Sequence, residues 1–87
     1  MPSYEEVLQI TSDLVRHRAD QAKLPPEIQP TDRIQEDLGL DSLAVMELAS
    51  DVEGRFGVSI PAEMYDAIHT VAELARAVMD LQSKRAG

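Results

Sequence analysis

Ser42 has the clearest chemical potential of any residue in this sequence, and it lies in the stretch DLGLDSLAVME at residues 37–47. Asp41, directly before it, is able to cap a helix that begins at the serine, so the serine hydroxyl is not needed for that purpose. A hydroxyl on the first residue of a helix projects outward, and an anionic group attached to it is stabilised by the helix dipole by roughly 0.3 to 1 kcal/mol. The position suits a phosphodiester, while the simpler interpretation is a serine that only begins a helix.

Other catalytic or ligand-binding chemistry finds no support in the sequence. His17 and His69 have no carboxylate at a recognised metal spacing, and the chain contains no cysteine. The motif of a calcium-binding loop, the G-x-S-x-G motif of hydrolases and a glycine-rich phosphate loop are all missing. We therefore expect a protein that is not an enzyme and that holds no metal.

The negative charge of the chain is concentrated around Ser42. The net charge is −8 at pH 7, and residues 27–53 hold eight acidic side chains against a single basic one, Arg33. This charge argues against nucleic acids and anionic membranes as partners, because both attract lysine and arginine. It leaves two interpretations, a hydrated surface that keeps the protein in solution or a surface that attracts a basic partner. No apolar run approaches the roughly 20 residues that cross a bilayer, and no signal sequence is evident, so we expect a cytoplasmic protein without membrane insertion.

The composition predicts a small all-α fold. Of the 87 residues, 44% are hydrophobic and 3% aromatic, which suits one domain of packed helices over residues 1–87. Apolar residues at helical spacing predict a first helix from Ser3, its N-cap, to about Lys23. Three prolines then stop this helix. The long connector that follows is expected to be tethered to the core by Ile34 and Leu38.

The later helices have recognisable ends. They are expected at Ser42 to about Phe56, Pro61 to Asp66 and Thr70 to about Ser83. Gly57 is a natural C-terminal stop, and Thr70 with Glu73 forms a capping box. The predicted fold is a bundle of three main helices and one short helix, with an ordered core over about 3–83 and a frayed tail at 84–87.

Residues 37–61, DLGLDSLAVMELASDVEGRFGVSIP, resemble the acyl carrier protein family, whose hallmark is an Asp-Ser-Leu triplet at the head of the second helix. The triplet here is Asp41-Ser42-Leu43. The resemblance covers about Ile34 to Leu81. Further matches in type and spacing are Asp37-Leu38-Gly39, Glu47-Leu48, Phe56, Ile60-Pro61 and Thr70-Val71.

The resemblance implies a freestanding, monomeric carrier without catalytic activity. Ser42 would be esterified by 4′-phosphopantetheine, which a separate phosphopantetheinyl transferase adds from coenzyme A. The terminal thiol of this arm would carry acyl groups as thioesters to acyl-loading and acyl-processing enzymes with basic docking surfaces. This fits the lack of cysteine, because the protein needs no thiol of its own.

The resemblance also implies two groups of residues around the arm. In each group the apolar members have a plain structural interpretation as well, because Leu48 and Val52 would be core residues in any bundle. The expected recognition face consists of Asp41, Leu43, Met46, Glu47 and Glu53. The expected lining of an interior pocket for the cargo consists of Ile34, Leu48, Val52, Ile68 and Val71.

Several residues depart from the pattern of carriers in fatty acid synthesis. Ala44, Ser50 and Gly54 thin the usual recognition patch, and the bulky Tyr65 would narrow the inner cavity. These departures favour a polyketide or related specialised pathway over housekeeping fatty acid synthesis. Two alternatives stay open, namely an aminoacyl or aryl carrier of a nonribosomal peptide pathway and an unmodified acidic interaction module.

Overall fold

The computed structural model describes residues 2–20, 22 and 24–86. The secondary structure of this part of the chain is helical, apart from one isolated β-bridge between Arg33 and Thr70. The elements are α1 (Tyr4–Arg18), α2 (Ser42–Phe56), the 3₁₀ helix η2 (Ala62–Ala67) and α3 (Val71–Ala86). The expected all-α fold of three main helices and one short helix is confirmed.

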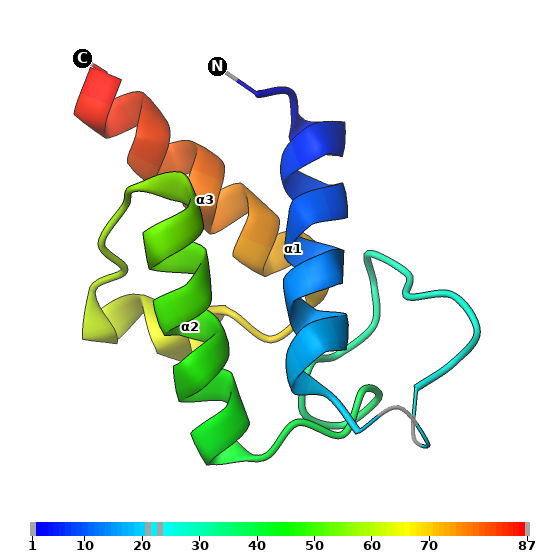
Figure 1. Ribbon diagram of the computed structural model, residues 1–87. Helices are drawn as coiled ribbons and strands as arrows, with labels where there is room; N and C mark the ends of the chain where they lie inside the picture. Colours follow the sequence, from blue (N-terminus) through cyan, green and yellow to red (C-terminus); the bar gives the residue numbers. More distant parts are fainter. Residues whose placement is uncertain (1, 21, 23, 87) are drawn as a thin grey trace.

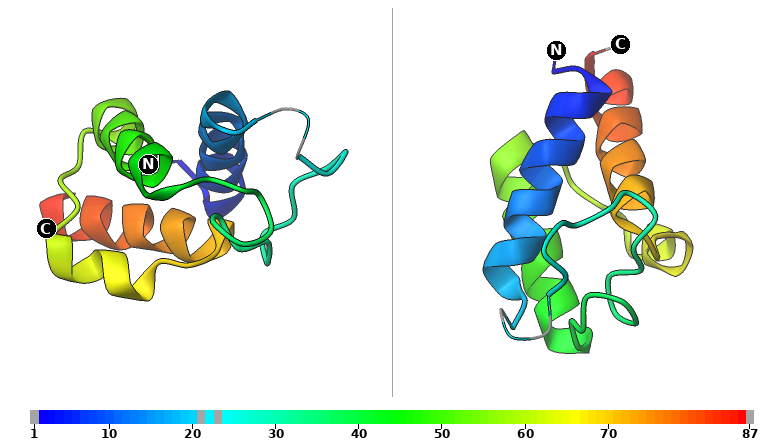
Figure 2. Two further views of the ribbon diagram at one scale, coloured as in Figure 1. Left: turned by 90° about the horizontal axis from the view of Figure 1, so that it is seen from below. Right: turned by 90° about the vertical axis from the view of Figure 1, so that its right-hand side faces the viewer.

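The three long helices enclose one core. Helices α1 and α2 lie side by side and run antiparallel, and α3 crosses behind both of them (Figure 1). The start of α1 and the end of α3 lie at one end of the molecule, while the start of α2 lies at the opposite end (Figure 2). Ser42 therefore lies at the end of the bundle where the connector enters α2.

Helix α1 is shorter than its apolar pattern predicted. Ser3 caps it as expected, because its hydroxyl accepts the Glu6 N–H at 3.2 Å. The helix ends at Arg18, since Ala19 takes an extended conformation and the Asp20 carboxylate accepts the Ala22 N–H at 3.0 Å in a tight turn. The predicted end at about residue 23 was wrong, and residue 23 itself lies outside the described residues.

The connector from residue 24 to residue 40 is anchored at two levels. Ile34 and Leu38 are buried in the core, which confirms them as its tethers. Backbone hydrogen bonds also join it to the start of α3, where helical N–H groups would otherwise lack acceptors. These bonds run from the Ile34 N–H to the His69 carbonyl, from the Val71 N–H to the Asp32 carbonyl, and from the Ala72 N–H to the Pro30 carbonyl.

Helix α2 has the ends that its sequence predicted. The Asp41 carboxylate accepts the Ala44 N–H at 2.8 Å and caps the first turn. At the other end Gly57 has a φ of 67°, in the left-handed region, and its N–H donates to the Glu53 carbonyl. These local signals fix where α2 begins and ends.

The C-terminal part follows the expected pattern with small differences. The segment after Pro61 forms the 3₁₀ helix η2 at Ala62–Ala67, one residue later than expected. The capping box of α3 is present, because Glu73 accepts the Thr70 N–H and the Thr70 hydroxyl accepts the Glu73 N–H. Helix α3 continues to Ala86 and so passes the expected end at Ser83. Fraying of the tail at 84–87 stays a prediction.

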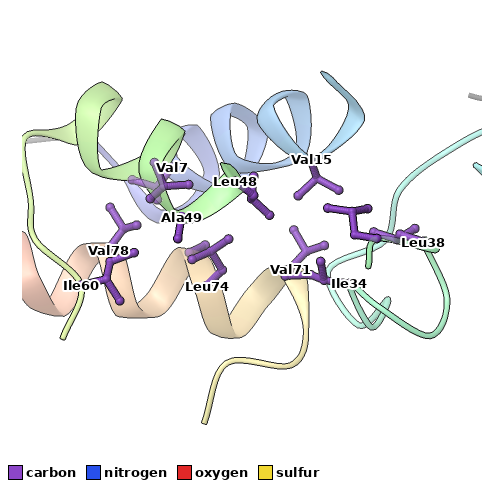
Figure 3. Packing of buried hydrophobic residues seen from close by; sticks show 13 residues of the cluster. Val7, Val15, Ile34, Leu38, Leu48, Ala49, Ile60, Val71, Leu74 and Val78 are labelled. Atoms are coloured by element: carbon purple, nitrogen blue, oxygen red, sulfur yellow. The ribbon is translucent and has the colours of Figure 1, made fainter. Parts of the chain in front are cut away.

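The core consists mainly of valine, leucine and isoleucine. Side chains from the three long helices converge between α3 and the α1–α2 pair, with Ile34 and Leu38 closing one side (Figure 3). Its largest fully buried apolar members, which confirm the predicted core positions Leu48 and Val52, are Val7, Val15, Leu38, Leu48, Val52, Val71 and Val78.

Candidate functional site

Ser42 is the first residue of α2 and is exposed to solvent. Asp41 already supplies the side-chain cap of the helix through the Ala44 N–H. The first turn of α2 contains no acidic side chain, so no carboxylate within that turn offsets the positive end of its dipole. The Ser42 hydroxyl thus lies where a covalently attached anion is favoured and where an enzyme can reach it.

The turn before Ser42 is braced by charge. The Asp37 carboxylate accepts the backbone N–H of Arg33 at 2.7 Å and its Nε–H at 3.3 Å, and Arg33 also pairs with Glu36. The backbone and guanidinium N–H groups of Arg33 lower the pKa of the Asp37 carboxyl. Leu38, directly after this carboxylate, is buried in the core. The segment before α2 is therefore fixed both by the contacts of Asp37 with Arg33 and by the buried side chain of Leu38.

A cavity of about 350 Å³ opens beside Ser42. That volume falls at the small end of the range of ligand pockets, which begins at about 300 Å³. Ser42 and Met46 contribute to its wall, and Tyr65 of η2 lines it from another element. The apolar residues of its wall are Ile34, Val45, Met46, Leu48, Ala49, Ile60, Ile68 and Leu74, and polar side chains include Arg33, Glu36, Asp66 and His69.

The structure brings together only some of the residues expected around this cavity. Ile34, Leu48 and Ile68 line it. Val52 and Val71 are fully buried in the core and do not belong to its wall. The sequence interpretation missed Val45 and Ala49, although their spacing from Ser42 gave a signal. Positions i, i+3, i+4 and i+7 share one face of a helix, and these are Ser42, Val45, Met46 and Ala49.

The expected recognition face combines exposed apolar side chains with carboxylates that form hydrogen bonds or ion pairs within the chain. Leu43 and Met46 are each 66% exposed, as the sequence predicted. Asp41 caps α2, and the Glu53 carboxylate accepts the Ile60 N–H at 2.7 Å. Glu53 therefore holds the segment after α2 in place, a role that the sequence did not suggest.

Glu47, the remaining member of this face, forms part of an ion-pair cluster between α1 and α2. Arg18 at the end of α1 donates from Nη1 to Glu47 at 3.2 Å. The same guanidinium holds Asp51 through two bonds, from Nε at 2.6 Å and from Nη2 at 3.0 Å. This hydrogen bonding, with smaller Coulombic contributions from Arg18 and His17, lowers the pKa of the Asp51 carboxyl.

Two kinds of site receive no support from the described residues. Among them, no three His, Asp or Glu side chains gather in an arrangement that could hold a metal ion. None of the helices in the described ranges combines the length and the apolar character needed to cross a bilayer.

Comparison with known proteins agrees with this geometry. Residues 12–78, which include Ser42, match the family model described as the phosphopantetheine attachment site. An acyl carrier protein of Streptomyces coelicolor is 38% identical over 61 residues, which cover 70% of this chain and 66% of that protein. An acyl carrier protein of Rickettsia bellii is 32% identical over 79 residues, covering 91% of this chain and 85% of the relative. The meromycolate extension acyl carrier protein of Mycobacterium tuberculosis is 33% identical over 60 residues, covering 69% and 52% respectively.

The chain belongs to the acyl carrier protein family. Proteins of this family are carriers rather than catalysts, and their cofactor is a covalently attached 4′-phosphopantetheine. The residues present fit such a group, because an exposed hydroxyl at a helix start adjoins a cavity with a largely apolar wall.

Proposed function

We propose that Ser42 is the residue that carries the phosphopantetheine arm and that the protein presents acyl groups on this arm to biosynthetic enzymes. The observation that carries the proposal is the exposed hydroxyl on the first residue of α2, within the segment that matches the attachment-site family. Loading would form a bond between Ser42 Oγ and phosphorus while the phosphoanhydride bond of coenzyme A breaks. The hydroxyl proton would pass to a base of the transferase, and the nucleotide half of coenzyme A would leave.

The residues around Ser42 would hold its hydroxyl in place and contact the partner enzyme. Asp41 keeps α2 starting at the serine, so that the hydroxyl faces solvent and the phosphodiester lies at the positive end of the helix dipole. Leu43 and Met46 would supply the apolar contact with an enzyme, because both are largely exposed within one turn of the serine. The arm supplies a thiol on which an acyl group is held as a thioester.

The cavity beside Ser42 would shelter the cargo between enzymes. Ser42, Met46 and Ala49 lie on one face of α2, and all three line the cavity. An arm attached to the serine would therefore start at the edge of the cavity. Burial of apolar surface favours this by about 0.8 kcal/mol for each methylene group. Ile34, Leu48 and Ile68 are the lining residues proposed for this contact.

For the pathway, we favour a polyketide or related specialised route over housekeeping fatty acid synthesis. Tyr65 of η2 lines the cavity, which supports a narrowed space for cargo. Ala44, Ser50 and Gly54 add no charge to α2, whose acidic side chains are Glu47, Asp51 and Glu53. A monomeric cytoplasmic carrier that meets enzymes with basic docking surfaces is the form in which we expect the protein to work.

Incubation of the purified apo protein with coenzyme A and a broad-specificity phosphopantetheinyl transferase tests the proposal by intact mass spectrometry. We expect the wild type to gain the mass of one phosphopantetheine group and Ser42→Ala to gain none. Ser50→Ala, also exposed on α2, is the matched control and should be loaded as the wild type is. Circular dichroism should show the same helix content in all three proteins. An unchanged mass of the wild type would instead favour an unmodified interaction module.

Loading of the holo protein separates the pathways. Transfer of a malonyl or another acyl group from its coenzyme A ester by an acyltransferase would support an acyl carrier. Loading by an adenylating enzyme with an amino acid or an aryl acid would support the nonribosomal peptide alternative. Thioester formation at the arm is read from intact mass in both cases.

A further inference from the structure

Arg18 connects the end of α1 to the middle of α2 through a cluster of three charged side chains, which we call the Arg18 cluster: Arg18, Glu47 and Asp51. The guanidinium binds both Asp51 oxygens, at 2.6 and 3.0 Å, and reaches Glu47 at 3.2 Å. Two parallel bonds between an arginine and a carboxylate are a strong and directional arrangement. In the sequence these carboxylates lie 33 and 29 residues from the arginine, so the fold alone brings the cluster together.

The Arg18 cluster changes what α2 offers to a basic partner. Helix α2 carries three carboxylates, and each has a partner within the chain. Glu47 and Asp51 bind Arg18, and Glu53 accepts the Ile60 N–H. The apolar contacts, Leu43 and Met46, are largely exposed. A partner that approaches α2 with lysine or arginine thus meets carboxylates that are already paired.

The cluster remains accessible from solvent. The side chains of Arg18, Glu47 and Asp51 are 32%, 47% and 24% exposed, so a cation of another protein can reach the carboxylates. Ion pairs at such partly exposed positions remain in contact with water, which screens them and solvates the charges when they separate. The arrangement can therefore be opened by a competing cation without unfolding either helix.

We propose that Arg18 is an internal competitor for the basic docking surfaces of partner enzymes, and that it thereby helps to determine which enzymes the carrier serves. The inference rests on the proposed carrier function. A partner that relies on pairing with Glu47 and Asp51 must displace Arg18, whereas one that relies on Leu43 and Met46 binds without doing so. Removal of Arg18 would favour the first kind of partner and broaden the set of enzymes that accept the carrier.

The alternative is a purely structural bond that holds α1 against α2. Both roles predict a lower melting temperature for Arg18→Gln, so stability does not distinguish them. They differ in the effect on association. Competition predicts faster and more salt-dependent association when Arg18 is removed, because two carboxylates become available to steer a basic partner. A structural bond predicts no gain.

The test measures kcat/KM for loading by a phosphopantetheinyl transferase with a basic carrier-binding face, at salt concentrations from about 0.01 to 1 M. At low salt we expect Arg18→Gln to exceed the wild type by about tenfold, the lower end of the range for electrostatic steering. The difference should vanish at about 1 M, where the screening length is about 3 Å. Circular dichroism at the assay temperature establishes that the variant is folded.

Arg76→Gln is the matched control for charge. Arg76 lies on α3, with its guanidinium 5.9 Å from the centre of the Tyr4 ring at the start of α1. Tyr4 and Arg18 are separated by about 20 Å along α1, given the rise of an α-helix, so Arg76 lies far from the Arg18 cluster. This control removes the same positive charge without touching the cluster, and it should load like the wild type. The triple variant Arg18→Gln, Glu47→Gln and Asp51→Asn should lose the gain of the single variant.

Several outcomes would overturn the proposal. Equal kcat/KM and equal salt dependence for Arg18→Gln and Arg76→Gln would leave Arg18 with a structural role only, while normal loading of both would preserve the carrier function. Absence of loading in the wild type would remove the carrier function and this inference with it.

A measurement on the wild type avoids any folding defect of the variants. The NMR signal of the Arg18 Nε–H should shift on saturation with a transferase, and an unchanged signal contradicts displacement.

Discussion

Two glycines at the end of α2 allow a test of where the helix ends. Gly54 lies inside the last turn of the helix, and a Cβ placed on it would meet no heavy atom within 4 Å. Gly57 follows the helix with a φ of 67°, a conformation that side-chain-bearing residues rarely adopt. The same substitution, glycine to alanine, should therefore change stability in opposite directions at positions three residues apart.

The magnitudes follow from backbone physics. Alanine is more favourable than glycine in a helix interior by about 0.8 to 1 kcal/mol, so Gly54→Ala should stabilise the fold by nearly that amount. The left-handed conformation costs a residue with a Cβ about 1 to 2 kcal/mol, so Gly57→Ala should destabilise by that amount. In a domain of this size each 1 kcal/mol moves Tm by about 4 to 8 °C.

Thermal unfolding followed by circular dichroism measures both variants against the wild type. Both substitutions lie at the opposite end of α2 from Ser42, so loading by the transferase should proceed in each folded variant and serves as the control for a native surface. A fall in Tm for Gly54→Ala, or a rise for Gly57→Ala, would refute the assignment of the helix end.

Two further predictions concern buried polarity and pH. Thr11 of α1 is fully buried, and its hydroxyl has no hydrogen-bond partner among the described residues. Thr11→Val should therefore stabilise the fold by about 1 kcal/mol, measured by urea unfolding. A lower urea midpoint for the variant would contradict this. The N–H groups of Thr70 and His69 lower the pKa of Glu73 from its ordinary 4.5, so the ionised carboxylate stabilises the fold above that pH and the contribution is lost on acidification. The gap in Tm between the wild type and Glu73→Gln should thus be present at pH 7 and close as the pH falls below 4.5 and through the lowered pKa of the carboxyl; a gap independent of pH would argue against the capping charge.

The sequence predicted best those features that neighbouring residues determine. Asp41 and Gly57 give the ends of α2, and Thr70 with Glu73 gives the start of α3, because each cap satisfies backbone groups within one turn. The end of α1 was not predictable in this way. Its apolar pattern continued past the point where Asp20 turns the chain, and no glycine or proline marks that point.

Contacts between distant segments were the part that the sequence could not provide. A count of charges over residues 27–53 found Arg33 as the only base, yet Arg18 from α1 forms ion pairs with two of the acids in the folded chain. The cavity shows the same limit. Helical spacing correctly placed Leu48 and Val52 in the interior, but only Leu48 borders the cavity, since its shape depends on η2 and the connector as well.

Under the proposed function, the position of Ser42 at the junction of surface and cavity would link the fold to the work of a carrier. A chain tethered at Ser42 would gain about 0.8 kcal/mol for each methylene that entered the cavity, while the exposed Leu43 and Met46 would offer an enzyme a contact immediately outside it. A short cargo would therefore gain little by entering and would stay available, whereas a longer one would be protected until an enzyme binds. Because paired carboxylates add little attraction, this enzyme contact would depend mainly on apolar area unless the partner displaced Arg18. On these proposals, the balance between shelter and delivery would be set by cargo length on one side of Ser42 and by the Arg18 cluster on the other.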